Sequence, residues 1–185
     1  IDDETPSDLV YNWGALEWTS DLPIRFIRGP LTYHLAVYTF DETLAIYREE
    51  NRTVLGQRLD LTQAQARELV IFVDRNAQPE NRDYAYHHFH DNCSTRVRDV
   101  IDDVTGGALR RGGERPIGQS YREQGYWRTG LPSWAMMVFD LIANESWDQQ
   151  TTAWQSTFLP INLHAEVARA RIGDRPLVYA QHTYH

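Results

Sequence analysis

Residues 84–99 read Tyr84-Ala-Tyr-His-His-Phe-His-Asp-Asn-Cys-Ser-Thr-Arg-Val-Arg-Asp99 and contain the only cysteine of the chain, Cys93. After Cys93, apolar side chains recur three and four residues apart, so we predict a helix from Asp91 or Asn92 to about Val104. Cys93 would then lie in the first turn, where free backbone N–H groups and the helix dipole favour a thiolate. The alternative is a small apolar side chain packed beneath the helix.

Length and composition limit the class of protein. At 185 residues the chain is long enough for one domain with a small extension. A single cysteine excludes an internal disulfide and a four-cysteine zinc site. All 18 basic residues are arginine, so no lysine is present for a P-loop, a Schiff base or a Ser–Lys dyad. The net charge of −8 comes without any basic block, which argues against nucleic acid as a partner.

The remaining pattern predicts an α+β fold in which an antiparallel sheet packs against the cysteine-bearing helix. Expected strands cover residues 9–18, 31–38, 52–61, 84–89 and 177–181, and Gly14 suggests a bulge or a close backbone approach. Expected helices cover residues 22–27 (a short turn), 41–50, 62–76, 134–142 and 163–171, with loops at 78–83 and 110–116. Within 62–76, the predicted buried stripe consists of Ala66, Leu69, Val70 and Val73. We divide the chain into a core, residues 1–117, and a mainly helical extension packed on it, residues 118–185.

A nucleophilic cysteine needs a base within hydrogen-bonding distance. His87, His88 and His90 lie close in sequence, but spacing alone favours none of them, and His34 is expected on the half-exposed face of its strand. A second interpretation is that His-His-x-His-x-x-Cys binds zinc or copper. Strand alternation separates His87 from His88, and no second ligand cluster exists in the sequence. We therefore predict neither a metal site nor a cofactor.

The quoted residues also resemble a known family. Tyr84-x-Tyr86 followed by Asp91-Asn92-Cys93-Ser94-Thr95-Arg96-x-Arg98-Asp99-x-Ile101 is similar to the signature of the Lnb-type N-terminal periplasmic domain, a family long described as a domain of unknown function. Further similar segments, in order, are residues 8–14, 17–18, 26–29, 31–33, 79–82 and 154–160. That family is similar to circularly permuted NlpC-type papain-like proteins, in which a histidine strand precedes the cysteine helix.

The resemblance implies roles for individual residues. Cys93 would be the nucleophile, Asn12 would orient the base, and Tyr86 would line the oxyanion site beside the Cys93 backbone N–H. The alternative for Asn12 is a structural role in a strand bulge. We further predict that Tyr84, His88, Asn92 and Arg96 contact the substrate.

One part of the family pattern is missing. Its histidine lies in a Gly-His strand upstream of the segment that matches residues 8–14, and this chain starts after that point. We therefore expect that the chain is truncated before Ile1 and lacks its general base, or that another histidine replaces it.

The resemblance implies acyl transfer to the N-terminal cysteine of bacterial lipoproteins through a Cys93 thioester. The partner would be a lipid or lipoprotein substrate, at the periplasmic side of the inner membrane, with membrane proximity provided by segments outside this chain. The alternatives are a papain-like cysteine peptidase or amidase of the cell envelope, and a catalytically inactive binding domain.

Overall fold

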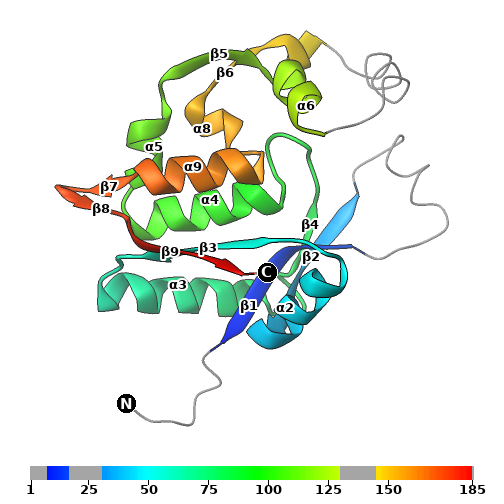
Figure 1. Cartoon of the computed structure of the whole chain (residues 1–185), viewed down its shortest axis with the longest axis vertical. Coiled ribbons are helices and arrows are strands. Elements are labelled where there is room, and N and C mark those ends of the chain that lie inside the picture. The colour runs from blue at the N-terminus through cyan, green and yellow to red at the C-terminus, as the bar shows by residue number, and fades with distance from the viewer. Residues whose placement is uncertain (1–7, 17–30, 130–144, 185) are drawn as a thin grey trace.

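A computed structural model represents the protein and describes residues 8–16, 31–129 and 145–184, without the side chains of 126–129. The helical turn expected at 22–27 and the helix expected at 134–142 lie outside the described residues. Within them the chain is α+β, as predicted, with small antiparallel sheets packed against helices (Figure 1).

Helix α4, Cys93–Val104, lies near the centre of the fold (Figure 1). Asn92 is its N-cap and Thr95 completes a capping box, which explains why the helix begins where the sequence predicts. Its apolar side chains point to two sides, with Val100 contributing to one buried cluster and Ile101 to another. Because α4 contributes to both clusters, it fixes the position of Cys93 between them.

The first cluster lies between α4 and a three-stranded antiparallel sheet. The sheet consists of β1 (Leu9–Ala15), β2 (Thr32–Thr39) and β4 (Asp83–Ala85), in the order β1-β2-β4. Helix α3, Gln63–Asn76, packs on the same cluster and begins with a Thr62–Gln65 capping box, close to the predicted start at residue 62. The buried members are Trp13, Leu35, Val73, Tyr84 and Val100. This arrangement confirms the predicted sheet packed against the cysteine-bearing helix.

The second cluster lies on the other side of α4. It includes residues from α5 (Ala108–Gly113) and α9 (Pro160–Arg169), with side chains of β3 (Val54–Leu59) and β9 (Val178–Tyr184) around them. Strand β3 pairs with β9 in an antiparallel ladder from Val54–Tyr184 to Leu59–Val178. A segment close to the N-terminal sheet in sequence therefore pairs with a segment more than a hundred residues later.

The remaining elements surround these clusters. Helix α2 covers Phe40–Glu49. After α5 come β5 (Pro116–Ser120), α6 (Tyr121–Thr129), the 3-10 helix η1 (Glu145–Asp148), β6 (Gln150–Thr152) and α8 (Ala153–Ser156). Two short strands, β7 (Arg171–Ile172) and β8 (Arg175–Pro176), follow α9. Phe89, Tyr121 and Phe158 form a third buried cluster. The ladders β3–β9 and β5–β6 each join residues from both sides of position 117. The division of the chain there stays a prediction.

Three local predictions were wrong. Val70 is 53% exposed, because the buried stripe of α3 follows Leu69 and Val73 and leaves Val70 to one side. The loop expected from residue 110 begins only after Gly113, where α5 ends. The extended run expected to Phe89 ends at Ala85, and a turn closed by the His87–Asp91 bridge follows. That turn directs Phe89 into the third cluster.

Candidate active site

Cys93 is the first residue of α4 and is half-buried. Its neighbour Asn92 is 3% exposed, and its side chain bonds both to the first turn of the helix and to backbone groups outside it. The Asn92 Oδ1 accepts hydrogen bonds from the backbone N–H groups of Ser94 and Thr95, at 2.9 Å each. Its Nδ2 donates to the carbonyl oxygens of His88 at 2.8 Å and Phe158 at 3.0 Å. These bonds give Asn92 a structural function, while substrate contact by Asn92 stays a prediction.

Two opposing effects act on the pKa of the Cys93 thiol. Burial raises the pKa of Cys93 above its ordinary value, and this effect exceeds the opposing effect of the backbone N–H groups of Ser94 and Cys93. The backbone N–H groups at the helix start thus favour the thiolate, as expected from the sequence, and desolvation, which the sequence does not indicate, outweighs them. A nearby proton acceptor is needed before Cys93 can act as a nucleophile at neutral pH.

Strand β1 approaches Cys93 through a glycine. The pairing of β1 with β2 is irregular between Asn12 and Ala15, where Gly14 lies, as predicted for a bulge. The Gly14 backbone N–H donates to the Asn12 Oδ1 at 2.7 Å. A Cβ on Gly14 would lie 3.0 Å from that Oδ1 and 3.9 Å from the Cβ of Cys93. The bulge therefore brings Asn12 and Gly14 next to Cys93, while the role of Asn12 in orienting a base stays a prediction.

Tyrosine rings cover another side of Cys93. Tyr86 stacks on Tyr33 with ring centroids 4.3 Å apart. Burial, and then the charge that Cys93 would carry when ionised, raise the pKa of Tyr86 well above its usual range. Tyr86 therefore keeps its proton and can donate a hydrogen bond near Cys93, which suits the predicted oxyanion site. The hydroxyl of Tyr84 instead donates to the Trp13 carbonyl oxygen at 2.6 Å, and its ring lies under the Arg96 guanidinium.

A cavity of about 370 Å³ opens beside the thiol. Its walls come from β1, β3, α4 and α9. The lining residues include Gln57, Leu59, Val97, Leu163, His164 and Val167. None of its described lining residues is an aspartate, glutamate, lysine or arginine. Gln57 and His164 were missed by the sequence analysis. Gln57 and His164 lie near Cys93 because of the β3–β9 pairing and the packing of α9. No local sequence motif indicates that pairing or that packing.

The histidines near Cys93 in sequence have other neighbours. The His87 Nδ1 accepts hydrogen bonds from the backbone N–H groups of Phe89 and His90, so it stabilises the turn. His88 makes an edge contact with the Tyr86 ring, with centroids 5.4 Å apart. His34 pairs with Ala15 and Asp83 in the sheet. Within residues 8–16, 31–129 and 145–184, no group of three or more histidine, cysteine, aspartate or glutamate side chains is arranged to hold a metal ion.

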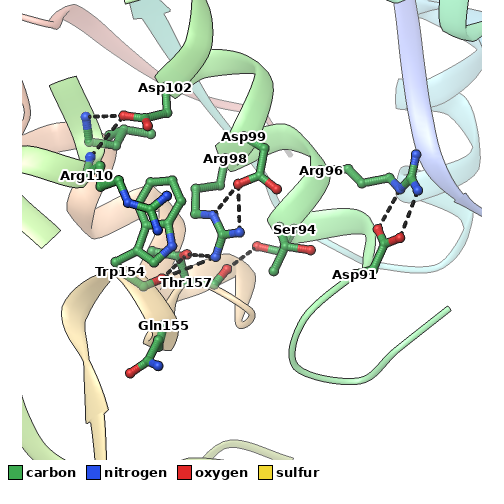
Figure 2. Close-up of polar contacts among 12 residues, drawn as sticks. Asp91, Ser94, Arg96, Arg98, Asp99, Asp102, Arg110, Trp154, Gln155 and Thr157 are labelled. Atoms are coloured by element: carbon green, nitrogen blue, oxygen red, sulfur yellow. Dashed lines mark hydrogen bonds and ion pairs between the residues drawn. The ribbon is translucent and has the colours of Figure 1, made fainter. Parts of the chain in front are cut away.

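The opposite face of α4 is charged. Arg96 forms a two-bond ion pair with Asp91, at 2.7 and 2.8 Å (Figure 2). Both residues line a second cavity of about 350 Å³, together with His90 and Asp99. Trp13 lines both cavities. Arg96, which was predicted to contact the substrate, therefore lines a different cavity from the one beside the Cys93 thiol.

Polar contacts fix α4 to the segment that precedes α9 (Figure 2). The Ser94 hydroxyl donates to the Thr157 carbonyl oxygen at 2.7 Å. The Arg98 guanidinium lies over the Trp154 ring, 4.0 Å from its centroid, and also pairs with Asp99. These contacts position the wall of the cavity that α9 supplies.

The fold and the site define a class: an α+β protein with a cysteine at the start of a central helix, next to an uncharged cavity. The model of the Lnb N-terminal periplasmic domain family matches residues 17–123, and the chain belongs to this family. Its location is therefore the periplasm. Searches of curated proteins and of solved structures returned no match. Among the described helices, none is both long and apolar enough to cross a membrane.

Proposed function

We propose that Cys93 carries an acyl group as a thioester and transfers it to an amine, namely the N-terminal cysteine of a bacterial lipoprotein. In the first step the thiol attacks an acyl ester: the new C–S bond forms, the ester C–O bond breaks, and the leaving alcohol takes the thiol proton. In the second step the amine attacks the thioester: the amide C–N bond forms, the C–S bond breaks, and Cys93 regains a proton. Two easier steps replace one difficult step.

The observation that carries this proposal is the cavity beside the thiol. Leu59, Val97 and Leu163 give it an apolar wall, and no formally charged aspartate, glutamate or arginine lines it in the described structure. An acyl chain gains free energy when its methylenes leave water, whereas charged groups lose it. The absence of charged residues from the cavity contrasts with the chain as a whole, which has 26 acidic and 18 basic residues. These properties favour a lipid-derived acyl group over a charged peptide.

The other parts of the site have proposed roles in these steps. Tyr86 and the Cys93 backbone N–H stabilise the oxyanion of the tetrahedral intermediates. Asn12 orients the proton acceptor of the thiol. That acceptor is a histidine, as the family resemblance implies, and His164 is the histidine that lines the Cys93 cavity in the described structure.

We also propose that the domain acts at the periplasmic surface of the inner membrane. Segments outside this chain would tether it there. The substrate would be a lipoprotein whose acyl ester and free amine are both within reach of one thiol.

The test uses the full product of the gene with a synthetic diacylglyceryl lipopeptide. Mass spectrometry of the intact protein should show one acyl adduct that hydroxylamine removes, and the lipopeptide should gain an amide-linked acyl chain. Cys93→Ala should lose both signals. An alanine variant that still forms the amide product, or a wild-type protein that cleaves peptide amides without accepting an acyl group, would overturn the proposal.

A further inference from the structure

Helices α4 and α9 run in the same direction along the Cys93 cavity. At their N-terminal ends, the two helices are linked by hydrogen bonds. The Ser94 hydroxyl donates to the Thr157 carbonyl oxygen and the Asn92 Nδ2 donates to the Phe158 carbonyl oxygen, just before α9 begins. At the other end, Ile101 of α4 belongs to the same buried cluster as Val167 of α9. Figure 1 shows the two helices side by side. The cavity between them is therefore bounded by two roughly parallel helices.

Each helix presents one stripe to this cavity. On α4 the stripe is Cys93, Val97 and Ile101, spaced four residues apart. Eight residues of helix give it a length of about 12 Å. On α9 the stripe is Pro160, Leu163, His164 and Val167. Both stripes run along the helix axes, which is the direction in which an extended chain would lie between them.

Both stripes are more exposed at the end near the thiol than at the far end. Cys93 and Val97 are half-buried, while Ile101 is buried. On α9, Pro160 is exposed, Leu163 is 7% exposed, His164 is half-buried and Val167 is only 3% exposed. The slot is therefore open at the thiol and closed by apolar side chains at Ile101 and Val167.

From this gradient we infer that the slot between α4 and α9 is the acyl-chain site, with the acyl carbon at Cys93 and the methyl end at Ile101 and Val167. The inference rests on the proposed acyl transfer and adds the direction of the chain and the residues that select its length. Helix α9 lies outside residues 17–123, so chain selection comes from a part of the chain that the family model does not cover.

The first experiment uses the wild-type chain and needs no turnover. Cys93 is alkylated with an iodoacetamide that carries an octyl chain ending in a diazirine, and the photolysed protein is mapped by mass spectrometry. Crosslinks within residues 97–104 or 160–170 are the expected result. Crosslinks that concentrate on β2 or around Tyr86 would overturn the inference without affecting the proposed chemistry.

The second experiment measures thioester formation on Cys93 with butanoyl and octanoyl esters. Each buried methylene is worth at most about fourfold, so octanoyl should react about tenfold faster or more. Val97→Phe blocks the slot one helical turn from the thiol and should abolish this preference, so that octanoyl reacts no faster than butanoyl. Ile161→Phe is the matched control, because Ile161 is on the outer face of α9 and is 47% exposed.

The outcomes of the second experiment separate the two proposals. No adduct with either ester contradicts the proposed function itself. Adducts with a length preference that Val97→Phe leaves unchanged contradict the assignment of the slot. If circular dichroism shows that Val97→Phe is unfolded, the crosslinking map of the wild-type chain decides the question.

Discussion

The hydroxyl of Tyr84 donates a 2.6 Å hydrogen bond to the backbone carbonyl oxygen of Trp13. The bond spans the sheet, because Tyr84 is on β4, Trp13 is on β1, and β2 lies between them. Trp13 is flanked by Asn12 and Gly14, which lie beside Cys93. A buried tyrosine that was predicted to bind substrate thus also holds the strand that approaches the thiol.

Tyr84→Phe should lower the free energy of unfolding by about 1–3 kcal/mol, because it leaves a buried carbonyl oxygen without its donor. Urea unfolding followed by circular dichroism measures the change. Tyr38→Phe is the control. Because Tyr38 is exposed, loss of its hydroxyl should lower the free energy of unfolding by less than about 0.5 kcal/mol. Equal effects of the two variants would contradict a specific role for the bond to Trp13.

Tyr86→Phe should slow thioester formation on Cys93 by about a hundredfold, the usual effect of removing one oxyanion donor. Tyr33→Phe, in the ring stacked on Tyr86, should change the rate much less. The measurement is the rate of adduct formation with a single acyl ester, under conditions where both variants are folded. A Tyr86→Phe rate within threefold of wild type would argue that Tyr86 only covers the thiol.

Gly14→Ala should displace the Asn12 side chain, because the new Cβ would lie 3.0 Å from the Asn12 Oδ1. Since this atom ends a side chain and not a backbone segment, the stability cost should stay below about 1 kcal/mol. Thioester formation on Cys93 should nevertheless fall severalfold if Asn12 orients the base. Gly112→Ala introduces a Cβ with no neighbour within 4 Å and should leave the rate unchanged.

Cys93 should react with iodoacetamide more slowly than a free thiol at neutral pH, and the rate should rise with pH through its raised pKa. The same shift makes the neutral thiol the form that the fold prefers. Its contribution to stability is fully present below the pKa of the unfolded state and is lost as the pH rises through the folded-state pKa. The difference in unfolding free energy between wild type and Cys93→Ala should therefore shrink toward alkaline pH. A pH-independent difference would show that the thiol is not desolvated.

Asn92→Ala should cost about 3 kcal/mol, since it removes the cap of α4 and leaves the carbonyl oxygens of His88 and Phe158 without a donor. Thr62→Ala removes only the exposed cap of α3 and should cost about 1 kcal/mol. Thermal unfolding of both variants measures the difference. If the two costs are equal, the bonds to His88 and Phe158 contribute little.

Local chemistry explains which predictions succeeded. The starts of α3 and α4 were predicted within two residues, and in the structure both helices begin at capping boxes, Thr62–Gln65 and Asn92–Thr95. The bulge at Gly14 was also predicted from a glycine within a strand. Each of these signals is contained in four or five consecutive residues.

What the sequence could not supply depends on long-range packing. The turn at residues 87–91 follows from the burial of Phe89 against Tyr121 and Phe158, which no strand pattern contains. The raised pKa of Cys93 depends on how much water the surrounding elements exclude, whereas the helix start alone suggested a thiolate. Gln57 and His164 come to the cavity through β3 and α9, which are remote from Cys93 in sequence.

The pairing of β3 with β9 also has a consequence for how the protein is made. Gly56 finds its ladder partner, His182, only after more than a hundred further residues have been synthesised. Contacts of such large sequence separation slow folding, because a long loop must close before they form. This ladder, and the wall of the Cys93 cavity that packs beside it, can therefore form only after residue 184 has been synthesised. Until then the apolar side chains of β3 lack their ladder partners, and exposed apolar strands of this kind are prone to aggregate.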